Sequence, residues 1–134
     1  MRKNYHCPLE SQEQRTVMDW AMTQPILRDY LIHIPNGGYR KALEARNLKR
    51  QGVRKGVSDF FLPWPTYSNM RLPIYGLWIE MKRRDEKISR LTIDQKKWIS
   101  KMNELGYLAT VAYGADQAME IFKSYLFGAL NEKI

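Results

Sequence analysis

The chain has 134 residues, of which 44% are hydrophobic and 27% charged; these values fit one folded domain and exclude a disordered chain. The formal net charge of +8 indicates a polyanionic partner, with nucleic acid ahead of an anionic membrane. One cysteine and two histidines exclude an intramolecular disulfide and a Cys/His zinc site. Because no apolar run is long enough to span a bilayer and no signal-peptide core follows the N-terminus, we expect a cytoplasmic protein with no membrane partner.

The first half of the chain is predicted to combine helices with one short strand. Apolar residues at helical spacing predict a helix over residues 10–23. Residues 30–34 read as a strand, which the Pro-Asn-Gly-Gly sequence at 35–38 ends. A strongly basic helix is expected over residues 40–50, ending at Gly52.

The second half is more clearly patterned. Residues 57–62 form a strand candidate, and residues 66–73 are expected to form a loop. The nearly continuous apolar run over 74–82 predicts a central strand buried on both faces. A helix, a strand and a final helix are then expected, at 92–105, 107–113 and 116–130. This order of elements predicts an α/β fold with helices around one mixed sheet.

Charged side chains stand out where the most apolar strand ends. Glu80 and Lys82 are two residues apart, so their side chains share one face of that strand. Asp59 opens the neighbouring strand candidate and reaches the same cation as Glu80 if the two strands are adjacent. Mg²⁺ keeps several waters, so two carboxylates suffice as protein anchors, and the backbone carbonyl near Met81 is a candidate third ligand.

This set of residues predicts phosphodiester hydrolysis. A divalent cation polarises the phosphate and acidifies a bound water. Lys82 would orient that water or offset the charge that grows in the transition state. The alternative is structural ion pairing, because Glu-x-Lys triplets and aspartates at turns are each common in folded proteins.

Together these residues resemble a known nuclease signature. Asp59 with Glu80-Met81-Lys82 resembles the PD-(D/E)XK motif, and the wider sequence is similar to the VRR-NUC family, the virus-type replication-repair nucleases. The matching segments run in order along nearly the whole chain: 10–14, 34–38, 52–59, 76–82, 95–98 and 106–107. Ser58 stands where the family usually has proline, and this residue shapes a turn rather than the chemistry.

The resemblance implies a single nuclease domain over residues 1–134 with a helix–three-strand–helix–strand core. In this chain we expect that core to be restriction-endonuclease-like, with a central mixed four-stranded sheet flanked by helices. The resemblance also implies Mg²⁺ or Mn²⁺ at Asp59 and Glu80, with no small-molecule cofactor. An acidic residue of the first helix is implied at the metal; Glu10 is favoured, and Glu13 is the alternative.

Gln95 resembles the family glutamine on the helix that follows the Glu-x-Lys strand. Its spacing from Thr92 also fits a capping box, so the simpler alternative is that Gln95 only closes the start of that helix. Basic residues that precede the aspartate strand are candidate DNA contacts, and Asn36 could add a backbone amide, although a tight turn is the favoured explanation there. The candidate nucleic-acid-binding residues are Asn36, Arg40, Lys41, Arg54 and Lys55.

The substrate expected from the resemblance is branched DNA. Stand-alone family members resemble Holliday-junction resolvases and act as homodimers, and two-fold symmetry suits the two symmetric cuts of a four-way junction. The expected function is therefore a structure-selective DNA endonuclease, with a phage or prophage origin implied by the family. The alternatives are a nuclease directed at flaps or nicks and a non-catalytic basic DNA-binding module.

Overall fold

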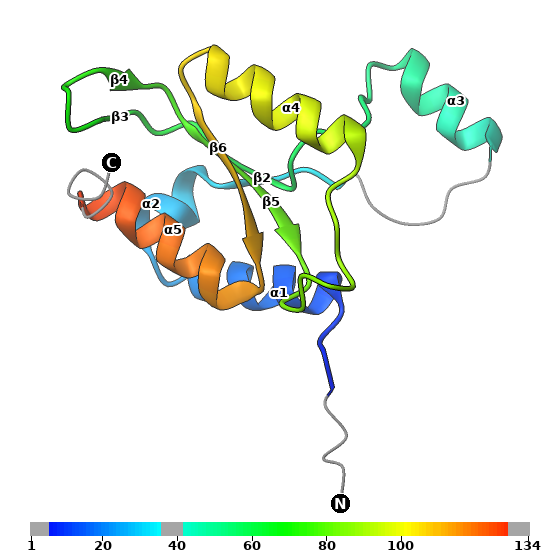
Figure 1. Ribbon diagram of the computed structural model, residues 1–134, viewed down its shortest axis with the longest axis horizontal. Helices are drawn as coiled ribbons and strands as arrows, with labels where there is room; N and C mark the ends of the chain where they lie inside the picture. Colours follow the sequence, from blue (N-terminus) through cyan, green and yellow to red (C-terminus); the bar gives the residue numbers. More distant parts are fainter. Residues whose placement is uncertain (1–5, 36–41, 129–134) are drawn as a thin grey trace, which may run out of the picture.

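A mixed sheet lies at the centre of the computed structural model, which describes residues 6–35 and 42–128 (Figure 1). Its four strands follow the order β1-β2-β5-β6. They are β1 (Ile32–His33), β2 (Phe60–Leu62), β5 (Leu77–Lys82) and β6 (Leu108–Tyr113). β1, β2 and β5 are antiparallel neighbours, whereas β5 and β6 run parallel. This arrangement confirms the predicted α/β fold with a central mixed four-stranded sheet.

Helices cover both faces of this sheet. The helices of the described residues are α1 (Glu10–Ala21), α2 (Pro25–Tyr30), α3 (Ala42–Arg50), α4 (Ile93–Glu104) and α5 (Ala115–Phe127). α1 and α5 pack together on one face, and α4 lies on the other (Figure 1). α4 forms the crossover that a parallel pair such as β5 and β6 requires. α3 projects away from the sheet and has no buried residue (Figure 1).

The alternation of side chains along β5 separates the core from the polar residues. Leu77, Ile79 and Met81 are fully buried in the apolar core, which includes residues of α1 and α5. Each such side chain contributes roughly 1.5–3 kcal/mol by leaving water. Trp78, Glu80 and Lys82 point to the opposite face, where Trp78 meets Trp98 of α4 with ring centroids 5.2 Å apart. Glu80 and Lys82 are therefore enclosed on the α4 face, outside the apolar core.

Apart from the strand expected over 57–62, which begins only at Phe60, three predicted segments differ in the structure. The predicted strand at 30–34 is only Ile32–His33, because helix α2 continues to Tyr30. Pro25 occupies the first position of that helix, where its fixed φ angle suits the first turn. The predicted loop at 66–73 forms a small hairpin, in which β3 (Thr66–Tyr67) pairs with β4 (Pro73–Ile74).

The third difference is a break in the predicted strand at 74–82. A Cβ atom at Gly76 would lie 2.8 Å from the Leu62 carbonyl oxygen and 3.0 Å from the Phe61 ring. The chain thus passes close to β2 at Gly76, between the end of β4 at Ile74 and the start of β5 at Leu77. Among the described residues, no helix is both long and apolar enough to cross a membrane.

Candidate active site

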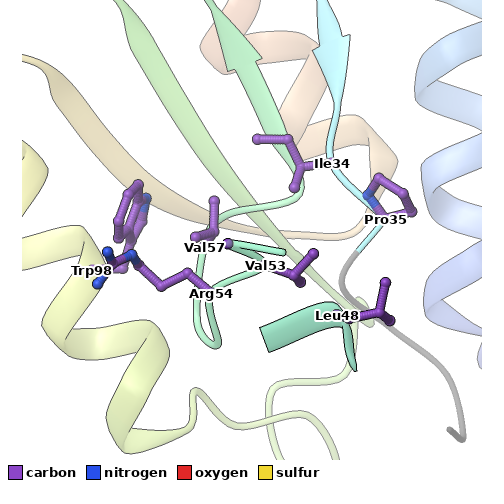
Figure 2. Close-up of a pocket in the computed structure, with 8 residues that line it drawn as sticks. Ile34, Pro35, Leu48, Val53, Arg54, Val57 and Trp98 are labelled. Atoms are coloured by element: carbon purple, nitrogen blue, oxygen red, sulfur yellow. The ribbon is translucent and has the colours of Figure 1, made fainter. Parts of the chain in front are cut away.

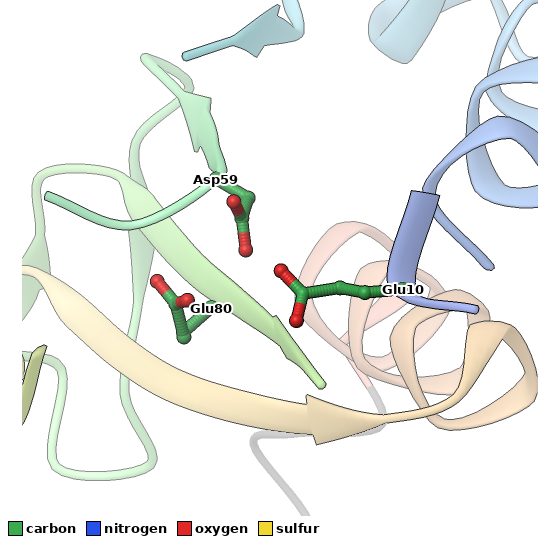
Figure 3. Close-up of side chains that lie close together, drawn as sticks. All are labelled: Glu10, Asp59 and Glu80. Atoms are coloured by element: carbon green, nitrogen blue, oxygen red, sulfur yellow. The ribbon is translucent and has the colours of Figure 1, made fainter. Parts of the chain in front are cut away.

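Three carboxylates from distant parts of the chain meet beside β5. One oxygen each from Glu10, Asp59 and Glu80 lies within 4.8 Å of the other two. Glu10 begins α1, Asp59 directly precedes β2, and Glu80 lies on β5. Figure 3 shows the Glu10 side chain reaching from the start of α1 toward the other two carboxylates. We call these three residues the acidic cluster; hard divalent cations favour such oxygen ligands.

Asp59 is fixed by the backbone on both sides of it. Its Oδ2 atom accepts a hydrogen bond from the Met81 N–H at 2.7 Å. Its carbonyl oxygen accepts one from the Ile34 N–H at 2.7 Å and lies 3.0 Å from Nδ1 of His33. The Asp59 carboxylate thus continues the pairing of β2 with β5 where the two backbones separate. These contacts hold the carboxylate beside Glu80.

Gln95 links the start of α4 to the acidic cluster. Its Oε1 atom accepts from the Thr92 N–H at 2.9 Å, and its own N–H donates to Thr92 Oγ1 at 3.1 Å. Its Nε2 atom donates to Glu80 Oε1 at 2.8 Å. The two functions considered for Gln95 are therefore compatible, because capping uses the amide oxygen and leaves the NH₂ group for Glu80.

The second oxygen of Glu80 is buried without a partner. Glu80 is 2% exposed, and Oε2 has no hydrogen bond within the part of the chain that the structure describes. A buried acceptor of this kind costs free energy unless a donor or a cation satisfies it. The residues present therefore fit a divalent cation among Glu10, Asp59 and Glu80.

Proton affinities in the acidic cluster reflect the same crowding. Burial, followed by the neighbouring Asp59 carboxylate, raises the pKa of Glu80 to about 9. Burial also raises the pKa of Asp59 and that of Glu10. Lys82 opposes all three increases in pKa. Lys82 is only 6% exposed, so its charge acts on these carboxyls from a largely water-excluded position. The cluster is thus poised to exchange a proton for a metal ion.

The structure brings Glu10 into the acidic cluster and places Glu13 elsewhere. Glu13 is 1% exposed, and its Oε1 accepts from Nε and pairs with an NH₂ nitrogen of Arg84, both at 2.8 Å. Its Oε2 accepts a short hydrogen bond from the Ala115 N–H at the start of α5. Glu13 thus joins α1 to α5, and this contact determines how α1 lies against the sheet.

Arg83 holds the segment that leads into α1. Its guanidinium donates to the Pro8 carbonyl at 3.0 Å and to the Cys7 carbonyl at 2.7 Å. Arg83 and Arg84 were not among the site residues predicted from the sequence. Their contacts hold the chain on either side of Glu10, at residues 7–8 and at Glu13. Their place directly after a buried Glu-x-Lys strand was the one available signal of this function.

The candidate DNA contacts are only partly described. Arg54 and Lys55 are exposed in the segment between α3 and β2. Asn36, Arg40 and Lys41 lie outside the described residues. The nucleic-acid-binding function of all five stays a prediction.

Loss of the Gln95 side chain should lower activity more than stability. We expect Gln95→Ala to reduce DNA cleavage about 10- to 100-fold, because Glu80 loses the donor that orients it. Thr92→Ala is the matched control: it removes the side-chain cap, costs about 1 kcal/mol of stability and leaves the Thr92 N–H bound to Gln95. Thermal unfolding and cleavage rates of both variants check this. Equal activities in the two variants would reduce Gln95 to a helix cap.

Comparisons with known proteins identify the family of this chain. The sequence model of the VRR-NUC domain matches residues 2–116. A solved structure described as a VRR_NUC domain protein superposes with a TM-score of 0.74 at 28% sequence identity, and the match covers 91% of each chain. Comparison with curated proteins finds no match. The family match spans most of the sequence and includes every residue of the acidic cluster. The chain therefore belongs to the VRR-NUC family of nuclease-type domains.

Proposed function

We propose that this protein is a Mg²⁺- or Mn²⁺-dependent endonuclease that hydrolyses phosphodiester bonds in branched DNA. The observation that carries the proposal is the meeting of Glu10, Asp59 and Glu80 within 4.8 Å, with Lys82 on the same strand face as Glu80. Family membership supports a nuclease and DNA as its substrate. The preference for branched DNA, the metal requirement and a homodimeric state belong to the proposal.

The metal ligands in this proposal are the three carboxylates and the Met81 carbonyl. The Met81 N–H points toward Asp59. Since both backbone groups of a strand residue point to the same neighbouring strand, the Met81 carbonyl faces the Asp59 side as well. The pairing of β2 with β5 ends at Phe60 and Ile79, so the sheet register assigns no β2 partner to Met81. This favours the Met81 carbonyl as a ligand.

The residues around the acidic cluster each have a defined task. A bound divalent cation supplies charge neutralisation at the phosphate and lowers the pKa of an attacking water. Gln95 holds Oε1 of Glu80, which leaves Oε2 directed to the site. Met81 holds Oδ2 of Asp59 in the same way. The Lys82 ammonium donates to the attacking water or to a phosphate oxygen and offsets the negative charge that grows there.

The proposal is tested by comparing the cleavage of a four-way junction with that of a linear duplex. We expect a homodimer by sedimentation, because one small domain offers a limited DNA footprint and two-fold symmetry presents two sites to a symmetric junction. The dimer should cut a synthetic immobile junction faster than a matched linear duplex in Mg²⁺ or Mn²⁺. DNA binding should fall steeply with salt, since the net charge of +8 makes counterion release a large contribution.

Two outcomes would change this conclusion in different ways. A monomer that cuts junction and duplex equally would remove the branched-DNA preference and leave the nuclease. A protein that binds the junction and never cuts it with either metal would instead be a basic DNA-binding module.

A further inference from the structure

A polar pocket lies beside α4, outside the acidic cluster. Its volume is about 190 Å³, and it is lined by two segments of the chain: Arg54 and Lys55 before β2, and Asp94, Lys97, Trp98 and Lys101 of α4. Four of these six residues are cations and one is an anion. We propose that this basic pocket binds a backbone phosphate of the DNA and fixes the strand relative to the acidic cluster. The proposal rests on DNA being the substrate, as proposed above.

A glycine allows the two walls of the basic pocket to approach each other closely. Gly56 has a φ of +83°, which L side chains rarely adopt, and a Cβ atom there would lie 2.5 Å from the backbone carbon and oxygen of Asp94. The segment before β2 therefore packs directly on the first turn of α4. This contact places Arg54 and Lys55 beside the helix, and Figure 2 shows the Arg54 side chain extending toward Trp98.

The α4 wall is a single helical face. Asp94, Lys97, Trp98 and Lys101 follow the i, i+3, i+4, i+7 spacing of one side of a helix. Both lysines are exposed. Within the described ranges, no ion pair joins Asp94 to a cation of the pocket. The excess positive charge is thus accessible to a diffusing anion, and the neighbouring cavity, lined largely by apolar residues such as Ile34 and Val53, shares only Arg54 of the four cations (Figure 2).

The basic pocket is connected to the acidic cluster through both walls. Gly56 lies three residues before Asp59, and Gln95, which contacts Glu80, lies between Asp94 and Lys97. Since a helix rises about 1.5 Å per residue, Lys97 and Lys101 lie roughly 3 Å and 9 Å further along α4 than Gln95. A strand of duplex DNA advances about 3.4 Å per nucleotide along its axis. The pocket therefore suits a backbone phosphate close to the one being cut.

The test compares two double substitutions that remove the same charge. Lys97→Gln/Lys101→Gln changes the basic pocket. Arg71→Gln/Lys123→Gln, between β3 and β4 and on α5, changes exposed cations away from α4 (Figure 1). Binding of a fluorescent immobile junction is measured by anisotropy in EDTA over a range of salt. Thermal unfolding confirms that both variants are folded, which is expected because all four side chains lie at least partly in solvent.

We expect the pocket variant to bind the junction about tenfold more weakly. The slope of its log affinity against log salt concentration should be smaller in magnitude by about one to two, while the control stays near wild type. Equal losses in both variants, or wild-type binding by the pocket variant, would overturn the proposal. Cleavage in Mg²⁺ or Mn²⁺ separates it from the proposed function. If the wild-type protein never cuts and only the pocket variant loses binding, the nuclease is refuted and the pocket is supported. If the wild-type protein cuts and the pocket variant binds normally, the nuclease is supported and the pocket is refuted.

Discussion

We expect Glu80→Gln to abolish DNA cleavage, by a factor of about 10³ or more, and to stabilise the metal-free protein at neutral pH. The loss of activity is expected because glutamine keeps the shape of the side chain but gives the metal site a neutral ligand. It replaces the carboxylate that lies beside Asp59 and accepts from Gln95. Single-turnover cleavage in Mg²⁺ and Mn²⁺ measures this loss. Turnover like that of wild type would remove Glu80 from the active site.

The gain in stability follows from the raised pKa of Glu80. This carboxyl titrates near 4.5 in the unfolded chain and at about 9 in the folded protein, so unfolding releases a proton between these pH values. The free energy of unfolding that Glu80 contributes is therefore fully present below pH 4.5 and decreases as pH rises toward 9. Glutamine does not titrate, so the variant should melt on the order of 5 °C above wild type at neutral pH and show little difference in acid.

Thermal unfolding in EDTA across this pH range checks the expected gain. Glu104→Gln, at the exposed end of α4, is the matched control and should change neither activity nor melting temperature. Adding Mg²⁺ or Mn²⁺ should raise the melting temperature of wild type more than that of Glu80→Gln, because only the native site binds the ion tightly. A variant that melts below wild type at every pH would contradict the role of burial in raising the pKa of Glu80.

Lys82→Ala should slow the chemical step about 10²- to 10³-fold and change DNA affinity by less than about threefold. Lys82 is buried, and its charge lowers the pKa of each of the three carboxyls. Its charge therefore acts on the site rather than on distant phosphates. Removing a cation also favours metal binding electrostatically. The metal concentration for half-maximal activity should therefore stay constant or fall, which separates this variant from the loss of a ligand.

The measurement is the single-turnover rate and the dissociation constant on the same junction. Lys82→Arg retains the charge with a different shape and should recover part of the rate. If the rate and the affinity fall together in Lys82→Ala, the residue is a phosphate anchor.

The relation between Asp59 and Glu80 could be predicted because it depends on local patterns. The alternation of side chains along β5 assigns Glu80 and Lys82 to one face of that strand. β2 and β5 are both apolar and follow one another in the four-stranded sheet, so they were expected to be neighbours, as the structure shows. Helix α2 and the β3–β4 hairpin were missed, because six residues in a helix and two in a strand carry too little periodicity to detect.

The sequence favoured Glu10 over Glu13 as the acidic residue of α1 at the metal site but could not decide between them. Both residues lie in the first turn of α1, and their spacing leaves either one able to face the sheet. The choice depends on contacts with Arg84 and Ala115, which are 71 and 102 residues from Glu13. For Gln95 the sequence offered two functions, the helix cap and the contact with the metal site. The structure shows that it has both contacts, because its amide oxygen caps the helix and its NH₂ group donates to Glu80.

The contacts of α1 also determine when during synthesis the site can form. α1 leaves the ribosome before the rest of the fold, yet Glu13 needs Arg84 and the Ala115 N–H, and Glu10 lies between these contacts and those of Arg83. Domains assemble only as their later segments emerge. A nascent chain that has not yet extended to α5 therefore carries all three carboxylates without the arrangement that brings them together. Cation binding by the acidic cluster should therefore appear only in nascent chains that extend through α5.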